Sequence, residues 1–150
     1  MKPLNKSRKK VCVGDIFTIK IGDMYYFGRV IRTDAGFGEN KIWNLIYIYE
    51  AQSKDKNDIP ILDKNRLLIP PYVTNRQAWL RGYFETVENR PIEEADVLSS
   101  HCFKRFTGKY FDEVGDELSQ KLEPCSEYGL AGYEYIDEQI GAELNDRESR

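Results

Sequence analysis

The chain has 150 residues, the length of one ordinary domain, and folding at this length buries about 68–70% of the surface that an unfolded chain exposes. Hydrophobic residues make up 41% and aromatic residues 13% of the sequence, which excludes an intrinsically disordered chain. No run approaches the roughly 18 apolar residues of a membrane helix, and no apolar signal segment follows the basic N-terminus, so we expect a cytoplasmic protein without membrane contact.

Charge is unevenly distributed along the chain, although the net charge is only −3. Residues 1–32 carry eight Lys and Arg against two Asp, whereas residues 112–148 carry twelve Asp and Glu against one Lys and one Arg. Such a split favours a surface that binds a basic partner, although a solvated helix gives the same counts.

A single domain is predicted over residues 11–145, because no internal repeat and no long low-complexity linker divides the chain. Residues 1–10 are predicted to form a mobile basic arm, and residues 146–150 a frayed tail. The oligomeric state stays open at this stage.

The first predicted element is a hairpin over residues 15–31. Gly22-Asp23 stands between two β-rich runs and fits a two-residue turn, in which Gly supplies the positive φ. That turn predicts three facing pairs: Ile21 with Met24, Ile19 with Tyr26, and Phe17 with Gly28. One side of the ribbon is then apolar and faces the core, and the Phe17 ring lies over Gly28.

Further strands are predicted in the middle of the chain. Residues 42–49 are apolar or aromatic on both alternating faces, which predicts a central strand covered on two sides. A polar loop over residues 52–58 follows, and residues 67–69 form a strand that ends at Pro70-Pro71, at a sheet edge. Residues 79–87 are predicted to form another strand.

Helical signals come towards the end. Within residues 89–100, Pro91 is followed by Glu93, Glu94 and Asp96. A proline followed by acidic residues is typical of a helix start, so we predict a short helix or turn here. Tyr133, Ile136, Ile140 and Leu144 recur at helical spacing and predict a C-terminal helix that packs on the sheet. The fold class is therefore α+β: a curved, mainly antiparallel β-sheet with a C-terminal α-helix, the sheet either open or closed into a small SH3-like barrel.

The residue types that support catalysis or metal binding are sparse. His101 beside Cys102 forms a Cys/His site only in an unusual turn, so we interpret the pair as a packed Cys next to a surface His, with a Cys-dependent enzyme as a minor alternative. His101, Cys102, Cys12 and Cys125 would be the right number of ligands for zinc, but their spacing matches no known zinc site. The odd number and wide spacing of the three cysteines favour free thiols. No phosphate-binding glycine loop occurs. We expect no catalytic residues, no metal and no cofactor.

A nucleic-acid platform is the main alternative to a protein-binding surface. Tyr25, Tyr26 and Phe27 lie beside Arg29 and Arg32, which suits a small-barrel adaptor that binds nucleic acid or another protein. Half of these rings are already assigned to the core and the chain is acidic overall, so nucleic-acid binding is disfavoured.

Two blocks of the sequence carry a family resemblance. Residues 14–21 (GDIFTIKI) precede residues 26–30 (YFGRV), and residues 67–71 (LLIPP) precede residues 79–84 (WLRGYF). In order and spacing these blocks resemble the immunity protein 26 family of bacterial polymorphic toxin systems, and the likeness extends over about residues 11–145. The resemblance implies an intracellular bacterial protein that binds a cognate toxin domain and blocks it, without catalytic residues of its own.

The acidic C-terminal third is the predicted contact surface. Many toxin domains are nucleases with basic clefts, towards which an acidic partner is steered. The alternative is an acidic face that serves only solubility. The predicted toxin-binding residues are Asp112, Glu113, Asp116, Glu117, Glu134, Asp137 and Glu138.

Overall fold

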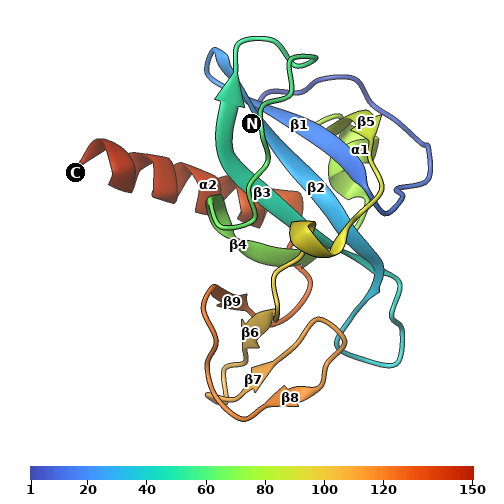
Figure 1. The fold of residues 1–150 in the computed structure, drawn as a ribbon, viewed down its shortest axis with the longest axis vertical. Helices are drawn as coiled ribbons and strands as arrows, with labels where there is room; N and C mark the ends of the chain where they lie inside the picture. Colours follow the sequence, from blue (N-terminus) through green and yellow to red (C-terminus); the bar gives the residue numbers. More distant parts are fainter.

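Two β-sheets and a C-terminal helix make up the fold in the computed structural model, which describes residues 1–150 (Figure 1). The larger sheet has the strand order β4-β3-β2-β1-β5 and is antiparallel throughout, and the smaller has the order β8-β7-β6-β9. The elements in chain order are β1 (Asp15–Ile21), β2 (Met24–Ala35), β3 (Trp43–Ser53), β4 (Leu67–Thr74), α1 (Gln77–Arg81), β5 (Glu85–Asn89), the 3-10 helix η1 (Glu94–Asp96), β6 (Cys102–Lys104), β7 (Tyr110–Phe111), β8 (Glu117–Leu118), β9 (Cys125–Glu127) and α2 (Tyr133–Glu148).

The α+β class with a mainly antiparallel sheet and a C-terminal helix is confirmed. Strands β4 and β5 lie at the two edges of the larger sheet and do not pair with each other. The sheet is therefore open, and the SH3-like barrel does not form. Neither helix has the length and apolar composition needed to cross a membrane.

The β1–β2 hairpin has the predicted register. Gly22 has φ +60° in the turn, and Phe17 faces Gly28 across the two strands. A Cβ on Gly28 would lie 2.2 Å from the Phe17 ring and 2.7 Å from the Tyr47 carbonyl oxygen, so no larger residue fits there without displacing the backbone of β3. The packing of Phe17 in the hairpin therefore requires glycine at position 28.

Strand β3 is central and buried on both faces, as predicted. On one face Ile46 and Ile48 join the main core beneath α1 and α2. On the other face Leu45, Tyr47 and Tyr49 join a second cluster that includes Phe103 of the small sheet. Because side chains alternate along a strand, one sequence run supplies both cores.

Two predicted elements are corrected by the structure. Strand β4 does not end at Pro70-Pro71 but continues to Thr74, because an edge strand pairs on one side only and an irregularity in the β3–β4 register accommodates both prolines. Residues 77–81, partly predicted as strand, form helix α1. Gly82 ends that helix with a left-handed φ of +81°, and β5 begins three residues later.

Helix α2 packs on the larger sheet through its predicted apolar stripe, with Ile136 and Ile140 fully buried. It extends behind the sheet in Figure 1 and continues to Glu148, into the segment predicted to fray. The shorter segment predicted in residues 89–100 is present as η1.

Residues 1–7, part of the predicted basic arm, make backbone contacts with the domain. The Leu4 N–H donates to the Gly82 carbonyl at 2.7 Å, and the Ser7 N–H donates to the Trp79 carbonyl at 3.0 Å. The N-terminal amine pairs with Asp137 on α2 at 2.8 Å. This segment therefore lies across α1 and reaches α2.

We predict that Trp79→Ala lowers the free energy of unfolding by about 3–5 kcal/mol, because its ring packs edge-on against Phe17 and Phe84 and leaves a cavity when removed. Trp79→Phe is the matched control: it keeps an aromatic ring, loses the hydrogen bond to Thr86, and should cost less than half as much. Equilibrium unfolding in urea measures both. An unchanged midpoint for Trp79→Ala would contradict its place in the core.

Candidate functional site

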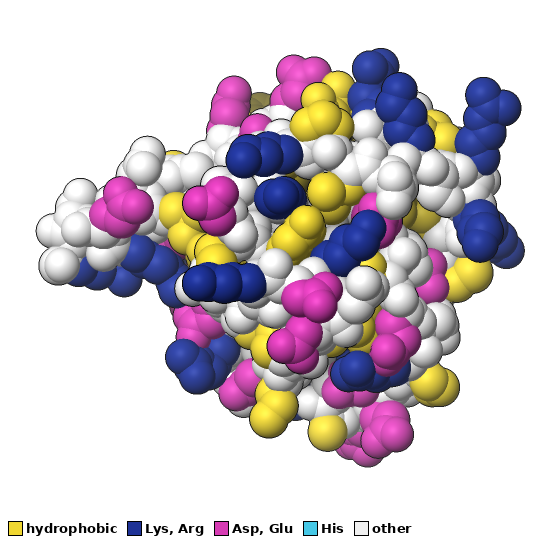
Figure 2. Space-filling model, turned by 90° about the horizontal axis from the view of Figure 1, so that it is seen from above, with side chains coloured by type: hydrophobic (Ala, Val, Ile, Leu, Met, Phe, Trp, Pro, Cys, Tyr) yellow, Lys and Arg dark blue, Asp and Glu magenta, His cyan; other side chains and the backbone are white.

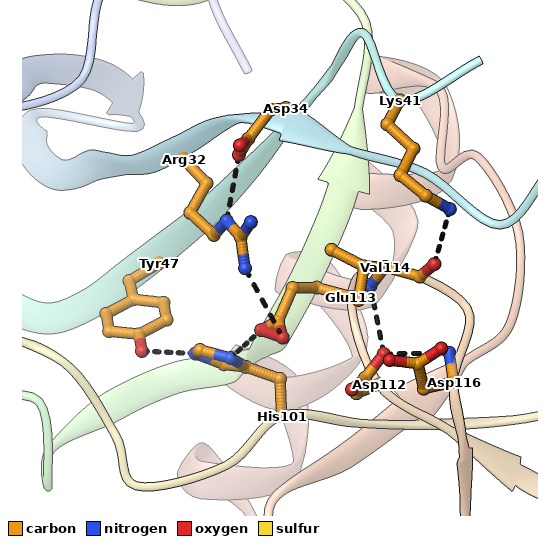
Figure 3. A network of polar contacts seen from close by, with 9 residues as sticks. All are labelled: Arg32, Asp34, Lys41, Tyr47, His101, Asp112, Glu113, Val114 and Asp116. Atoms are coloured by element: carbon orange, nitrogen blue, oxygen red, sulfur yellow. Dashed lines mark hydrogen bonds and ion pairs between the residues drawn. The ribbon is translucent and has the colours of Figure 1, made fainter.

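A buried chain of polar contacts joins the two sheets around His101 (Figure 3). The Tyr47 hydroxyl, from the middle of β3, lies 2.6 Å from His101 Nε2. On the other side of the ring, His101 Nδ1 pairs with the Glu113 carboxylate, from the turn between β7 and β8. The His101 side chain is only 5% exposed. The interpretation of His101 as a surface residue is therefore wrong, whereas Cys102 is packed as predicted.

The partners of this network define its proton arrangement. The Leu98 N–H donates to the Tyr47 oxygen, which leaves the Tyr47 O–H free to donate to His101 Nε2. His101 Nδ1–H then donates to Glu113. Each of these buried groups therefore has a partner within the network.

Glu113 links the network to the larger sheet. Arg32 on β2 lies 3.8 Å from its carboxylate and also pairs with Asp34 at 2.8 Å. Burial on its own raises the pKa of Glu113, but the hydrogen bond from His101 and the positive charges of His101 and Arg32 outweigh it, and the pKa lies below its ordinary value. The carboxylate is therefore held ionised inside the protein.

The contacts of this network stabilise the packing of the small sheet against β3. Burial raises the pKa of Tyr47 to about 12, so its hydroxyl remains protonated at neutral pH. The five main surface pockets are lined by other residues and do not reach Tyr47, His101 or Glu113. Although the residue types suit acid–base chemistry, their contacts point inward and hold the small sheet against β3.

The structure separates the seven predicted toxin-binding residues into two kinds. Three are engaged within the protein: Glu113 is buried in the network, Asp112 accepts the Val114 and Asp116 N–H groups, and Asp137 pairs with the N-terminal amine. Four are exposed, namely Asp116 in the β7–β8 turn, Glu117 at the start of β8, and Glu134 and Glu138 on α2. Glu117 also forms a surface ion pair with Lys109 at 3.4 Å. We therefore leave the first three out of the proposed contact surface.

Sequence reasoning missed the inward orientation of Glu113 and Asp112. For Asp112 a signal existed, since Asp followed by Gly three residues later is typical of a turn in which the side chain caps nearby N–H groups. For Glu113 no local signal existed, because its partners His101 and Arg32 come from other elements. Lys41, in the β2–β3 loop, adds a further contact to the same turn, at 2.6 Å from the Val114 carbonyl.

Most of the residues weighed as a nucleic-acid platform on the first hairpin are buried. Tyr26, Phe27 and Arg29 are each less than 9% exposed, whereas Tyr25 and Arg32 are partly exposed. Arg29 donates to the carbonyls of Arg90 and Pro91 and thereby fastens the segment before η1 to the larger sheet. The Tyr26 and Phe27 rings and the Arg29 cation therefore serve the core.

The four residues weighed as zinc ligands do not form a metal site. The structure has no group of three or more His, Cys, Asp and Glu side chains suited to a metal ion. Both ring nitrogens of His101 are already engaged, and Cys12 is exposed. Burial and the adjacent Cys102 raise the pKa of the Cys125 thiol to about 12, which is the opposite of an activated nucleophile.

These observations define a class: a small α+β protein whose buried polar groups hold its two sheets together. A comparison with family models then identifies the family, because the model of immunity protein 26 matches residues 12–111, more than half of the chain. The chain belongs to the immunity protein 26 family, which is in general non-catalytic. The match ends at Phe111, short of the residues 11–145 expected from the resemblance. No curated protein and no solved structure matches the chain.

We predict that His101→Ala lowers the free energy of unfolding by about 3 kcal/mol, because it leaves the Tyr47 hydroxyl and the Glu113 carboxylate buried without their partner. Urea unfolding at neutral pH measures the loss. Lys121→Ala, which removes an exposed cation, is the control and should change the midpoint little. A His101→Ala variant as stable as the parent would show that the network does not tie the sheets.

A second prediction concerns acid. Since the folded state lowers the pKa of Glu113, its contribution to stability is present above the unfolded pKa of about 4.5 and is lost as pH falls through the lower folded value. Glu113→Gln should therefore destabilise the protein most at neutral pH, and the difference from the parent should shrink below about pH 4. Glu117→Gln, at the start of β8 and exposed, should show no such dependence. Equal pH profiles for the two variants would contradict the role given to Glu113.

Proposed function

We propose that the chain binds the toxin domain of a cognate bacterial polymorphic toxin and blocks it in the cytoplasm of the producing cell. Membership of the immunity protein 26 family is the observation that carries this proposal. Binding, rather than chemistry on the toxin, also suits a scaffold whose His, Cys and Tyr side chains are engaged in internal contacts.

The proposed contact surface consists of the exposed carboxylates of the β7–β8 turn, of the start of β8 and of α2, namely Asp116, Glu117, Glu134 and Glu138. All four lie beyond residue 111, where the family match ends. A contact specific to one toxin needs side chains that distinguish that toxin from others, and we assign this role to these exposed carboxylates.

Charge supports the same choice. Residues 112–148 carry twelve Asp and Glu against two cations, and such a surface attracts a basic protein at long range. We propose a nuclease toxin, because a cleft that holds nucleic acid is lined by cations. Lys and Arg side chains gather at one edge of the face in Figure 2, on the side where Figure 1 has the N-terminal segment, and that edge suits a basic partner less well.

The proposed function is tested with the purified chain and the toxin domain encoded beside it. The chain should form a complex with that domain and abolish its activity on nucleic acid, and co-expression should restore growth of cells that produce the domain. Normal toxin activity in the presence of excess folded chain would overturn the proposal.

The contact surface is tested separately by association rate. Swapping Asp116→Asn and Glu117→Gln, or Glu134→Gln and Glu138→Gln, should slow association about three- to tenfold at low salt, with little change in dissociation. The effect should fade as salt rises, because exposed charges are screened beyond about 8 Å at physiological ionic strength.

A matched control removes the same number of charges elsewhere. Asp23→Asn with Asp58→Asn changes two exposed carboxylates, in the β1–β2 turn and in the β3–β4 loop. This control should leave the association rate near that of the parent. If the control slows binding as much as the acidic swaps do, only net charge matters and the proposed surface is wrong.

A further inference from the structure

Two of the three cysteines face each other in the small sheet. Cys102 on β6 and Cys125 on β9 are register partners in the parallel pair that joins these strands. Their Sγ atoms are 2.7 Å apart, in a thiol–thiol hydrogen bond. Cys12 lies far away in sequence, is exposed, and contacts only the Lys10 carbonyl through its Sγ atom.

The two thiols differ in their access to solvent. Cys102 is 3% exposed, whereas Cys125 is partly exposed and lines a surface pocket of about 290 Å³. Lys104, Lys121 and Glu127 line the same pocket, and its two cations against one carboxylate favour an anionic reagent. A small molecule therefore reaches Cys125 from solvent, and Cys102 lies directly behind it.

We propose that Cys102 and Cys125 form a dithiol site that low-molecular-weight disulfides convert into an intrachain disulfide. Neighbouring strands lie about 4.7–4.9 Å apart, within the range of about 4.4–6.8 Å between Cα atoms that a disulfide spans. The bond therefore forms without separating β6 from β9. This site is independent of toxin binding.

The reaction proceeds in two exchange steps. The Cys125 thiolate attacks one sulfur of the reagent disulfide RSSR, which forms a Cys125–SR bond and releases RS⁻, which takes up a proton as RSH. Cys102, after losing its proton, then attacks the Cys125 sulfur, forms the Cys102–Cys125 bond and displaces a second RSH. Two protein thiols are oxidised, and one reagent disulfide is reduced to two thiols.

The new bond closes the segment between β6 and β9. That segment includes β7, β8 and the exposed carboxylates Asp116 and Glu117. Reducing conditions leave the pair as two thiols, and oxidising conditions join the two ends of the segment covalently.

The test uses the full chain and oxidised glutathione. The incubation is run for hours at mildly alkaline pH, because the thiolate is the reacting species and the pKa of Cys125 is raised to about 12 by burial and by Cys102. Peptide mapping should find Cys102 linked to Cys125, and glutathione attached only to Cys12, whose exposed thiol exchanges with the reagent as well. A dithiol reductant should restore all three.

Two variants serve as controls. Cys12→Ser should lose both remaining thiols at the rate of the parent pair, because Cys12 takes no part. Cys125→Ser should keep Cys102 unreacted in the folded chain, because the buried thiol is shielded. The proposal is overturned if glutathione stays attached to Cys125, if Cys12 enters the disulfide, or if all thiols persist in the folded chain while the denatured chain reacts.

Discussion

Burial of strand β3 on both faces is the constraint on which the rest of the structure depends. Its residues alternate between a main core under α1 and α2 and a second cluster shared with the small sheet. A strand covered on two sides needs two layers of partners, and only one layer is supplied by helices. The β3–β4 loop, the segment around η1 and Phe103 of β6 supply the other layer.

The polar tie at His101 follows from that arrangement. Tyr47 belongs to the second face of β3, and its hydroxyl would be buried without a partner if the small sheet packed through apolar contacts alone. His101 and Glu113 satisfy it and at the same time orient the β7–β8 turn. The network thus couples the packing of the second core to the position of the exposed carboxylates next to Glu113.

The segment that matches the family and the segment richest in carboxylates occupy different parts of the chain. The family match covers β1 to β7, which is the larger sheet with α1, η1 and the start of the small sheet. Beyond it lie the β7–β8 turn, β9 and α2, where carboxylates are densest. The matched segment supplies most of both core clusters, and α2 completes the main core with Ile136 and Ile140.

The sequence by itself determined those features that depend on neighbouring residues or on a regular spacing of apolar residues. The hairpin register follows from a two-residue turn, the two faces of β3 from alternation, and the stripe of α2 from helical spacing, and all three are observed. Around Trp79 the same local reasoning failed, because a short apolar run fits a strand or a helix equally well and Gly82 alone marks where the helix ends.

Tertiary structure decided which polar residues face inward. Tyr47 and His101 are 54 positions apart in the sequence, so neither the burial of His101 nor the engagement of Glu113 follows from any neighbouring residue. The openness of the sheet likewise depends on which edges meet in space. Four of the seven predicted carboxylates are exposed and three are engaged within the protein, because the sequence gives a residue's charge while its partners come from distant strands.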